Sequence, residues 1–142
     1  MSEAPTTISR AYRMRVYPTD SQAAVLGRLF GAARFVWNWS LATRTRAWRE
    51  REERLNWIGL SREFTALRRE PATSWLAELP REPFNQVLRD QERAFANFFG
   101  KRAKYPRFKR RGGHAGVRFT LDQRRTQVTQ GTGRFATVEL PG

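Results

Sequence analysis

The feature that most restricts the fold of this chain is a run of apolar residues at helical spacing between Pro80 and Gly100. Its members, all apolar except Gln91, recur every three or four positions: Phe84, Val87, Leu88, Gln91, Ala94, Phe95, Phe98 and Phe99. This spacing predicts an amphipathic helix, because residues three and four apart lie on one helix face. Arg89, Arg93 and Asn97 fall on the opposite face, and Gly100 is placed to end the helix.

A second and longer helix is predicted from Thr19 to about residue 50. Thr19 and Gln22 match a capping box, in which each side chain bonds the backbone N–H of the other residue. The apolar stripe that follows contains Leu26, Leu29, Phe30, Ala33, Trp37 and Leu41. At about 100° per residue, the opposite face combines aromatic and basic side chains, namely Arg28, Phe35, Trp39 and Arg46.

A third and shorter helix is predicted to start at Leu60-Ser61 and to end before Pro71, with Phe64 and Leu67 pointing inward. We expect the apolar residues that follow to fill the core from a short turn, and these are Trp75, Leu76 and Leu79. The three helices would form one lobe over residues 19–100.

Strand patterns flank this lobe on both sides. Before Pro18, the residues Tyr12, Met14 and Val16 alternate with Arg13 and Arg15, which indicates a strand with one buried and one basic face. After the lobe, Val117, Phe119 and Leu121 show a similar alternation. Further strand-like segments follow near residues 126–129 and 135–140.

The simplest assembly pairs the first strand with the last ones, so that the helices are an insertion in a small β unit. The predicted class is therefore α+β. Residues 1–18 supply the N-terminal tail and first strand, and residues 101–142 supply a basic segment and the remaining strands.

The chain carries 27 Lys and Arg against 13 Asp and Glu among its 142 residues, a formal charge of +14. Such an excess destabilises the compact state by self-repulsion unless a polyanion neutralises it, so it indicates a polyanionic partner. No apolar run approaches the ~20 residues of a membrane span, and the N-terminus lacks the charged and apolar regions of a signal peptide. We expect a cytoplasmic protein that binds no membrane.

Among the basic residues, all but Lys101, Lys104 and Lys109 are arginine. The arginine fork grips phosphate with two hydrogen bonds and stacks on bases, which suits RNA or DNA. A GC-rich genome produces the same bias through codon usage, so this ratio alone decides little.

The strongest local signal is the segment Lys101–Arg111, in which seven of eleven residues are basic and none is acidic. Tyr105 and Phe108 lie among them, around Pro106. Basic residues neutralise phosphates, and aromatic rings offer stacking faces to unpaired bases. The alternative is a solvated linker with both aromatics docked on the core, but seven cations without a counter-charge favour nucleic acid.

Two further groups of residues have more than one interpretation. Phe35 and Trp39 are typical of a helix that is packed on two sides, although Arg28 and Arg46 beside them keep nucleic-acid contact open. The helices also carry amides that can read base edges, although hydrogen bonding between helices is their commoner role: Asn38, Asn85, Gln86 and Asn97.

The sequence predicts no catalytic residue, no metal ion and no cofactor. The absence of cysteine excludes disulfides, zinc fingers and thiol nucleophiles within these residues. The single histidine, His114, lies in a glycine-rich loop, where solvation is its commoner role. Metal-dependent phosphodiester cleavage needs clustered carboxylates, whereas most acids here, such as Glu50, Glu53 and Glu63, fall on charged helix surfaces.

Several motifs follow one another between Tyr12 and Leu140. In order they are Tyr12–Thr19 with Gln22, Gly31–Trp39, Leu67–Glu70 with Trp75-Leu76, Leu88–Asp90 with Ala94–Phe99, Lys104–Lys109, and Val117–Phe119. Together they resemble the TnpB (OrfB) proteins encoded by bacterial insertion sequences, which are described as transposase-associated and carry a front part labelled helix-turn-helix. The shared order of the motifs makes the match specific.

This resemblance implies an RNA-guided DNA endonuclease related to the type V CRISPR effectors. In that architecture a wedge-like β-barrel is interrupted by a recognition lobe, here three helices that are helix-turn-helix-like. Barrel and lobe hold the guide RNA, the heteroduplex and the short motif beside the target. The RuvC-like nuclease and zinc finger of the family would lie after Gly142, so no catalytic residue is carried over.

The resulting hypothesis is a nucleic-acid-binding N-terminal portion without its catalytic domain, located at the nucleoid of a prokaryote. Its partners would be structured guide RNA, double-stranded DNA and the remainder of the transposase. The predicted contact residues are Arg13, Arg15, Arg34, Arg89, Arg93, Lys101, Arg102, Lys104, Tyr105, Arg107, Lys109, Arg110, Arg111 and Arg118.

Other hypotheses remain open. The chain can be a stand-alone helix-turn-helix DNA-binding protein, or a truncated transposase that regulates transposition. It can also be an enzyme with an unusual active site, which metal-dependent cleavage by the purified chain would reveal. Finally, it can be a decayed remnant without a selected function.

Overall fold

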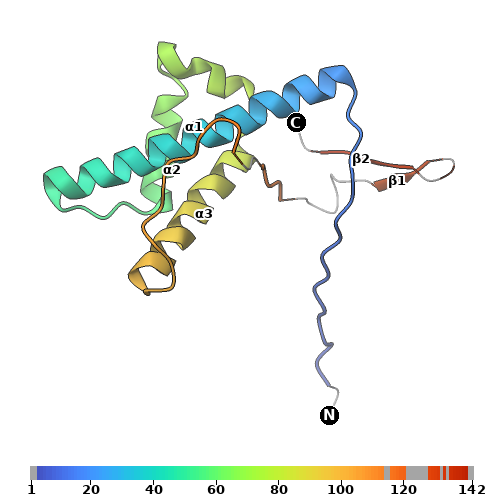
Figure 1. The fold of residues 1–142 in the computed structure, drawn as a ribbon, viewed down its shortest axis with the longest axis horizontal. Helices are drawn as coiled ribbons and strands as arrows, with labels where there is room; N and C mark the ends of the chain where they lie inside the picture. The colour runs from blue at the N-terminus through green and yellow to red at the C-terminus, as the bar shows by residue number, and fades with distance from the viewer. Residues whose placement is uncertain (1–2, 114–115, 121–127, 132, 134, 141–142) are drawn as a thin grey trace.

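The structure is a computed structural model that describes residues 3–113, 116–120, 128–131, 133 and 135–140. Within them lie α1 (Asp20–Arg51), α2 (Trp57–Leu67), the 3₁₀ helix η1 (Pro71–Glu78) and α3 (Glu82–Phe99). Strands β1 (Val128–Gln130) and β2 (Ala136–Val138) form an antiparallel ribbon. Figure 1 shows α1 as the long axis of a helical body, with the N-terminal segment running away from it.

Helix α1 begins where the sequence predicts. Thr19 Oγ1 accepts from the Gln22 N–H at 3.3 Å, and Gln22 Oε1 accepts from the Thr19 N–H at 2.9 Å, which completes the capping box. The helix ends at Arg51, because Glu52 adopts the left-handed conformation with φ 51°. Its 32 residues extend over about 48 Å, long enough to contact all the other helices.

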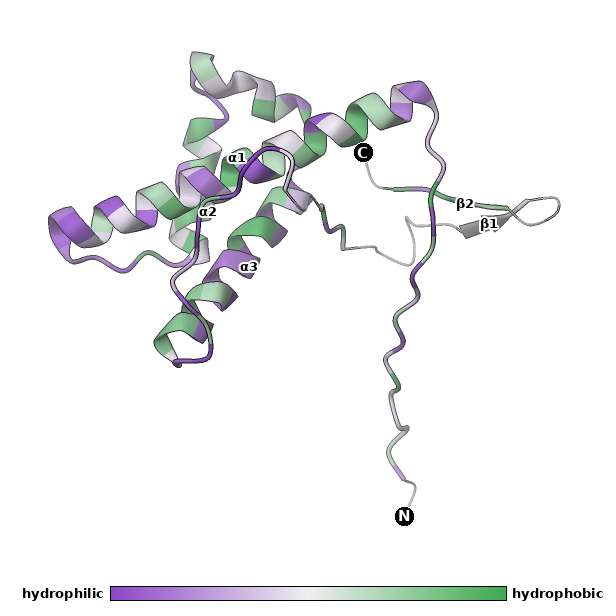
Figure 2. Ribbon diagram, viewed as in Figure 1, coloured by the Kyte–Doolittle hydropathy of each residue, from purple (hydrophilic) through white to green (hydrophobic). Residues whose placement is uncertain are grey.

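The core forms where the helical elements meet, and its buried members are Leu29, Ala32, Val36, Leu60, Phe64, Leu76, Leu79, Phe84 and Leu88. Phe64 packs against Trp39 and Phe84, with ring centroids 6.0 and 5.5 Å away. The guanidinium groups of Arg68 and Arg81 lie 5.9 and 5.3 Å from the Phe64 centroid. Figure 2 shows apolar residues recurring along every helix. None of the described helices is long and apolar enough to cross a membrane.

Helix α1 is covered on two sides, as the packing interpretation of its aromatic face expects. Phe35 and Trp39 are half-buried and pack against the core. The other side of α1 meets α3, where buried Ser40 donates to Gln91 Oε1 and Gln91 donates to the Trp37 carbonyl at 2.9 Å. The packing interpretation of Phe35 and Trp39 is therefore confirmed.

Two arginines within the helical body are affected by burial. Desolvation lowers the pKa of Arg44, against an opposing attraction from Glu92. Arg44 Nη1 donates to the Leu55 carbonyl at 2.7 Å and so holds the connection between α1 and α2. Desolvation and the neighbouring Arg68 lower the pKa of Arg81.

The three predicted helices are present, with differences at their ends. Helix α2 begins three residues earlier than Leu60, because Asn56 Oδ1 accepts from the Gly59 N–H at 2.8 Å and caps it. Helix α3 ends at Phe99, as Gly100 predicted. Leu76 and Leu79 are buried as expected, whereas Trp75 is 38% exposed.

The predicted wedge-like β-barrel is wrong, because the structure is mostly helical and its described strands form only one two-stranded ribbon. Residues 3–19 form an extended segment without strand pairing, and Tyr12, Met14 and Val16 are each more than 70% exposed. Residues in this segment do alternate between apolar and basic, but a strand also needs a partner backbone. Strands β1 and β2 pair with each other, and the segment reaches the ribbon through Tyr17, whose ring centroid lies 6.1 Å from that of Phe135.

The strand predicted from Val117 is also wrong over its described part. Residues 116–120 have no strand pairing, and Val117 and Phe119 pack against the helical core instead. Apolar residues two apart can be buried by a helical surface as well as by a sheet, so alternation alone did not distinguish them. Leu121, Thr126 and Gln127, which the predicted strands included, lie outside the described residues.

Candidate nucleic-acid interface

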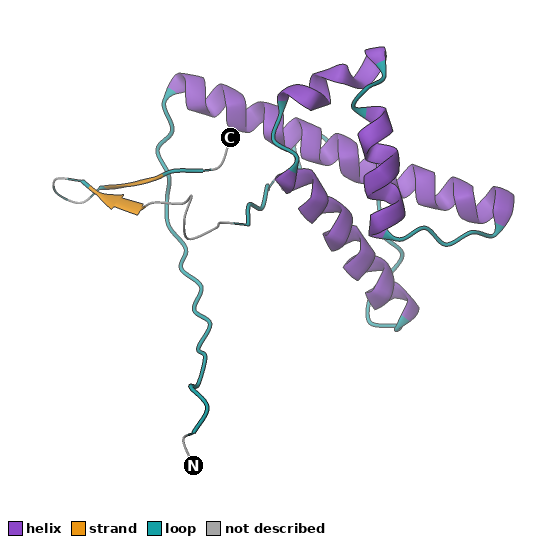
Figure 3. Cartoon of the chain, turned by 180° about the vertical axis from the view of Figure 1, so that it is seen from behind, coloured by secondary structure: helices purple, strands orange, loops and turns teal. Residues whose placement is uncertain are grey.

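After α3 the chain reverses and runs back across α1, as the orange segment in Figure 1 shows. In the opposite view of Figure 3, most of this segment is hidden behind the helices. We name residues 101–113 and 116–120 the strap. Its first turn is made by Lys101 in the left-handed conformation, with φ 59°. The N–H groups of Arg102 and Ala103 both donate to the Asn97 carbonyl, at 2.8 and 3.2 Å. Arg102 Nε also donates to Asn97 Oδ1 at 3.2 Å, so this predicted contact residue closes the end of α3.

Two neighbouring side chains of α1 hold the strap backbone. Trp37 Nε1–H donates to the Arg107 carbonyl at 2.8 Å. Asn38 Nδ2 donates to the Lys109 carbonyl at 3.0 Å, while Asn38 Oδ1 accepts from the Lys109 N–H at 2.8 Å. One amide thus bonds both backbone groups of Lys109 and fixes the register of the strap on α1. The ammonium of Lys109 lies 4.3 Å from the Trp37 ring centroid.

The two aromatics of the basic segment have different surroundings. The ring of Tyr105 packs edge-to-face on Phe95 and Phe98 of α3, with centroids 5.3 and 5.2 Å apart. Its hydroxyl lies 3.0 Å from Thr45 Oγ1. Phe108, in contrast, is 61% exposed. The segment is therefore anchored at Tyr105 and leaves the ring of Phe108 facing solvent.

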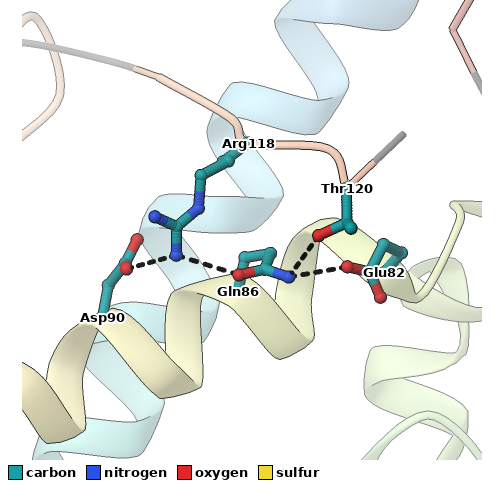
Figure 4. Close-up of polar contacts among 5 residues, drawn as sticks. All are labelled: Glu82, Gln86, Asp90, Arg118 and Thr120. Atoms are coloured by element: carbon teal, nitrogen blue, oxygen red, sulfur yellow. Dashed lines mark hydrogen bonds and ion pairs between the residues drawn. The ribbon is translucent and has the colours of Figure 1, made fainter. Parts of the chain in front are cut away.

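The far end of the strap is fixed on α3, as Figure 4 shows. Arg118 Nη2 donates to Asp90 Oδ1 at 2.6 Å and to Gln86 Oε1 at 2.9 Å. Gln86 Nε2 in turn donates to Thr120 Oγ1 and Glu82 Oε1, both at 2.7 Å. The charge of Arg118 is balanced by Asp90, so this predicted contact residue acts as an anchor in the structure.

The basic side chains between the anchors are exposed: Lys101, Arg102, Lys104, Arg107, Lys109, Arg110 and Arg111. The ion pairs found among the described residues join Arg28 to Glu78, Arg51 to Glu53 and Arg118 to Asp90, and none involves residues 101–111. The strap therefore presents uncompensated positive charge on a backbone that is held in place.

A cleft of about 350 Å³ lies between the strap, α1 and α3, and we name it the strap cleft. Four of the predicted contact residues line it, namely Arg34, Lys109, Arg110 and Arg118. Asp90 is the acid among its lining residues, and it already pairs with Arg118. The backbone of Gly112 and Gly113 completes the wall, with Gly112 at φ 81°, a conformation that favours glycine. The cleft is thus suited to an anion.

Four other predicted contact residues, namely Arg13, Arg15, Arg89 and Arg93, make no hydrogen bond or ion pair with the strap among the described residues. Arg89 stacks on Trp57 of α2, 4.4 Å from its ring centroid, and Arg93 is exposed on α3. Arg13 and Arg15 are exposed on the N-terminal segment, which runs away from the helical body. His114 lies outside the described residues. The described residues hold no group of three or more His, Asp or Glu that could bind a metal ion.

Sequence reasoning missed the residues that position the strap. The sequence pattern places Trp37 on the apolar stripe of its helix, and it predicts that Asn38 and Gln86 either read base edges or bond between helices, not that they hold residues 101–120. The hydrogen bonds between Asn38 and Lys109 join residues 71 positions apart. No local pattern reports such a contact, although the basic segment itself was found from its composition.

Comparison with known proteins places these observations in a family. Residues 6–53 match the sequence profile of a helix-turn-helix domain of the OrfB/IS605 type. A Streptomyces pristinaespiralis protein named "Putative RNA-guided DNA endonuclease" is 44% identical over 104 residues, which cover 73% of this chain and 26% of that protein. "Putative RNA-guided DNA endonuclease InsQ" of Escherichia coli (strain K12) is 32% identical over 123 residues, 84% of this chain and 31% of that protein.

A shorter relative, "Virulence protein VsdF" of Salmonella dublin, is 30% identical over 113 residues, which cover 73% of this chain and 95% of that protein. The chain spans only 26% and 31% of the two longer relatives. Residues 6–53, which match the helix-turn-helix profile, here form most of the extended segment and the single helix α1. The order of the motifs, the profile and the relatives agree, and the chain therefore belongs to the TnpB/OrfB family of insertion-sequence proteins, whose N-terminal part it matches.

Proposed function

We propose that this chain binds nucleic acid through the strap and the strap cleft. The observation that supports this most is that seven exposed cations lie on one acid-free segment whose backbone is anchored to α1 and α3. Anchoring matters because a preorganised segment loses less conformational entropy on binding than a free linker. Arginine forks then bond phosphate oxygens in pairs, and the lysines act as point charges.

The polyanions we propose are a structured guide RNA and double-stranded target DNA, bound as part of a TnpB-like RNA-guided DNA endonuclease. Support comes from the names of the two longer relatives, which state an RNA-guided DNA endonuclease. We assign cleavage to the parts of such proteins that lie outside the 26% and 31% of their length that the match covers. In this proposal the strap binds the phosphate backbone of the nucleic acid and recognises its shape. Base pairing between guide and target supplies the sequence specificity.

The proposal is tested with two variants of equal charge. In the first, Lys104, Arg107, Arg110 and Arg111 of the strap are each replaced by Gln. In the second, four exposed arginines outside the strap are replaced in the same way, namely Arg10, Arg49, Arg62 and Arg69. Both changes lower the formal charge of +14 by four, so any difference between them reports position and not net charge.

We expect the strap variant to lose about 100-fold or more in affinity for a structured RNA at 0.1 M salt, and the second variant to lose far less. The slope of log K against log salt is negative, and its magnitude falls by about 0.9 for every phosphate contact removed from a duplex. Equal losses of affinity and slope in the two variants would contradict the proposal, because binding would then follow net charge alone.

A stand-alone helix-turn-helix protein is the second candidate, and the profile match over residues 6–53 favours it. Helices α1 and α2 are joined by the short connection 52–56, so α2, which begins after the end of the matched residues, would be the recognition helix. Among the exposed side chains of α2, Arg62 is the one that can donate hydrogen bonds to a base edge, and Ile58 and Glu63 are exposed beside it. Competition between a DNA duplex and a structured RNA separates the candidates, since this one predicts that the duplex wins.

A further inference from the structure

A second groove opens on the face of α1 that carries Phe35 and Trp39. It has a volume of about 630 Å³, and its walls include Phe35 and Trp39 of α1 and Trp75 of η1. Gly31 contributes to the floor, and a Cβ atom placed there would meet nothing within 4 Å. The groove is therefore open space lined by three aromatic rings, and we name it the aromatic groove.

Trp75 is the ring in this groove that a ligand can reach most easily. It is 38% exposed, whereas Phe35 and Trp39 are half-buried against the core. Phe35 meets Trp75 edge-to-face, with centroids 5.6 Å apart and an interplanar angle of 68°. This contact supports the indole from one side and leaves part of it open to solvent. A planar group can stack on such a surface without first displacing a packed side chain.

The rim of the aromatic groove is basic and joins the strap cleft. Arg34 lines both the groove and the strap cleft. Asn38 lines the groove and bonds the backbone of Lys109. Arg28 also lines the groove and is paired with Glu78, at 2.7 Å. No acid is among the lining residues, and because Arg28 is balanced by Glu78, Arg34 supplies the positive charge for an anionic ligand that also carries a flat apolar group.

We propose that the aromatic groove binds one unpaired nucleotide, with its base stacked on Trp75 and its phosphate beside Arg34. This proposal rests on the proposed nucleic-acid binding and names a feature of it, namely a preference for a strand with an unstacked base. From Arg34 the strand continues toward Lys109 and Arg110 in the strap cleft. A paired base cannot enter, because its face is covered by its neighbours in the duplex.

The test uses the whole chain and two fluorescent probes, a single strand of about 15 deoxythymidines and a duplex of similar length. Trp75→Ala removes the stacking surface. We expect about 5- to 100-fold weaker binding of the single strand, an unchanged salt slope, and unchanged binding of the duplex. Trp75→Phe keeps an aromatic face and should restore most of the affinity.

A second pair of variants tests the same groove without removing a side chain, in case Trp75→Ala folds poorly. Gly31→Leu projects a side chain into the groove and also favours the helix, so it should block the single strand while stabilising α1. Gly27→Leu is its matched control, because a Cβ at Gly27 likewise meets nothing within 4 Å and Gly27 does not line the groove. Thermal unfolding confirms that each variant is folded.

Failure of this inference differs from failure of the proposed function. If the unaltered chain binds neither probe and no structured RNA, the proposed function falls and the groove proposal falls with it. If the chain binds but Trp75→Ala and Gly31→Leu leave single-strand affinity unchanged, only the groove proposal is overturned. Equal losses for the single strand and the duplex would also overturn it, since the groove would then not distinguish an unpaired base.

Discussion

Asn38 uses one side chain to satisfy both backbone groups of Lys109, and this is the contact that places the strap on α1. An amide is required there because one atom must donate and the other must accept. Asn97 differs from Asn38, because its bond to the strap uses only the side-chain oxygen, which accepts from Arg102 Nε. Replacement of each asparagine by aspartate should therefore affect the free energy of unfolding differently.

We predict that Asn38→Asp lowers the free energy of unfolding by about 1–3 kcal/mol, because a carboxylate oxygen then faces the Lys109 carbonyl. Asn97→Asp should change it by less than about 1 kcal/mol, because a carboxylate accepts from Arg102 at least as well. Urea unfolding of both variants measures the difference. Equal effects at the two positions would show that the Asn38 amide does not clamp the strap.

At the scale of the element, the ends of the helices carry two non-glycine residues in the left-handed region, Glu52 after α1 and Lys101 after α3. An L residue in this conformation costs about 1–2 kcal/mol, which a glycine avoids. Gly100 directly precedes Lys101 but has an ordinary φ of −79°. Lys101 therefore holds the strained position at the start of the strap.

We predict that Lys101→Gly and Glu52→Gly each raise the free energy of unfolding by about 0.5–1 kcal/mol. Their effects on RNA binding should differ. Lys101→Gly should weaken binding several-fold, because it removes a strap cation, whereas Glu52→Gly should not weaken it. Thermal unfolding and an RNA titration at fixed salt check the pair. A gain of affinity in Lys101→Gly would argue against a role for this charge.

At the scale of the molecule, the formal charge of +14 repels itself in the folded state. The described ion pairs are few and lie at exposed positions, so they offset little of this repulsion. Added salt screens the repulsion between exposed charges. Stability of the free chain and affinity for nucleic acid should therefore respond to salt in opposite directions.

We predict that Tm of the free chain rises by about 2–5 °C between 0.05 and 0.5 M NaCl. Over the same range, binding of RNA should weaken steeply as counterions compete for the phosphates. Differential scanning calorimetry with and without RNA measures both effects. A Tm that falls as salt is added to the free chain would mean that attraction between its charges outweighs repulsion.

Much of the helical body could be predicted from the sequence, because its signals are local. The capping box of Thr19 and Gln22, the Phe84–Phe99 stripe and the stop at Gly100 each involve residues within a few positions of one another. The basic character of residues 101–111 was likewise visible from composition. The family followed from the order of such motifs.

The tertiary structure alone decided how these parts are used. It left residues 12–16 exposed instead of placing them in a barrel, because strand pairing depends on a partner elsewhere in the chain. It set the register of the strap through the hydrogen bonds between Asn38 and Lys109. It also paired Arg118 with Asp90, so that Arg118 anchors the end of the strap. Periodicity and capping act over three or four residues, whereas these contacts join segments far apart in sequence and depend on the packed helices that bring them together.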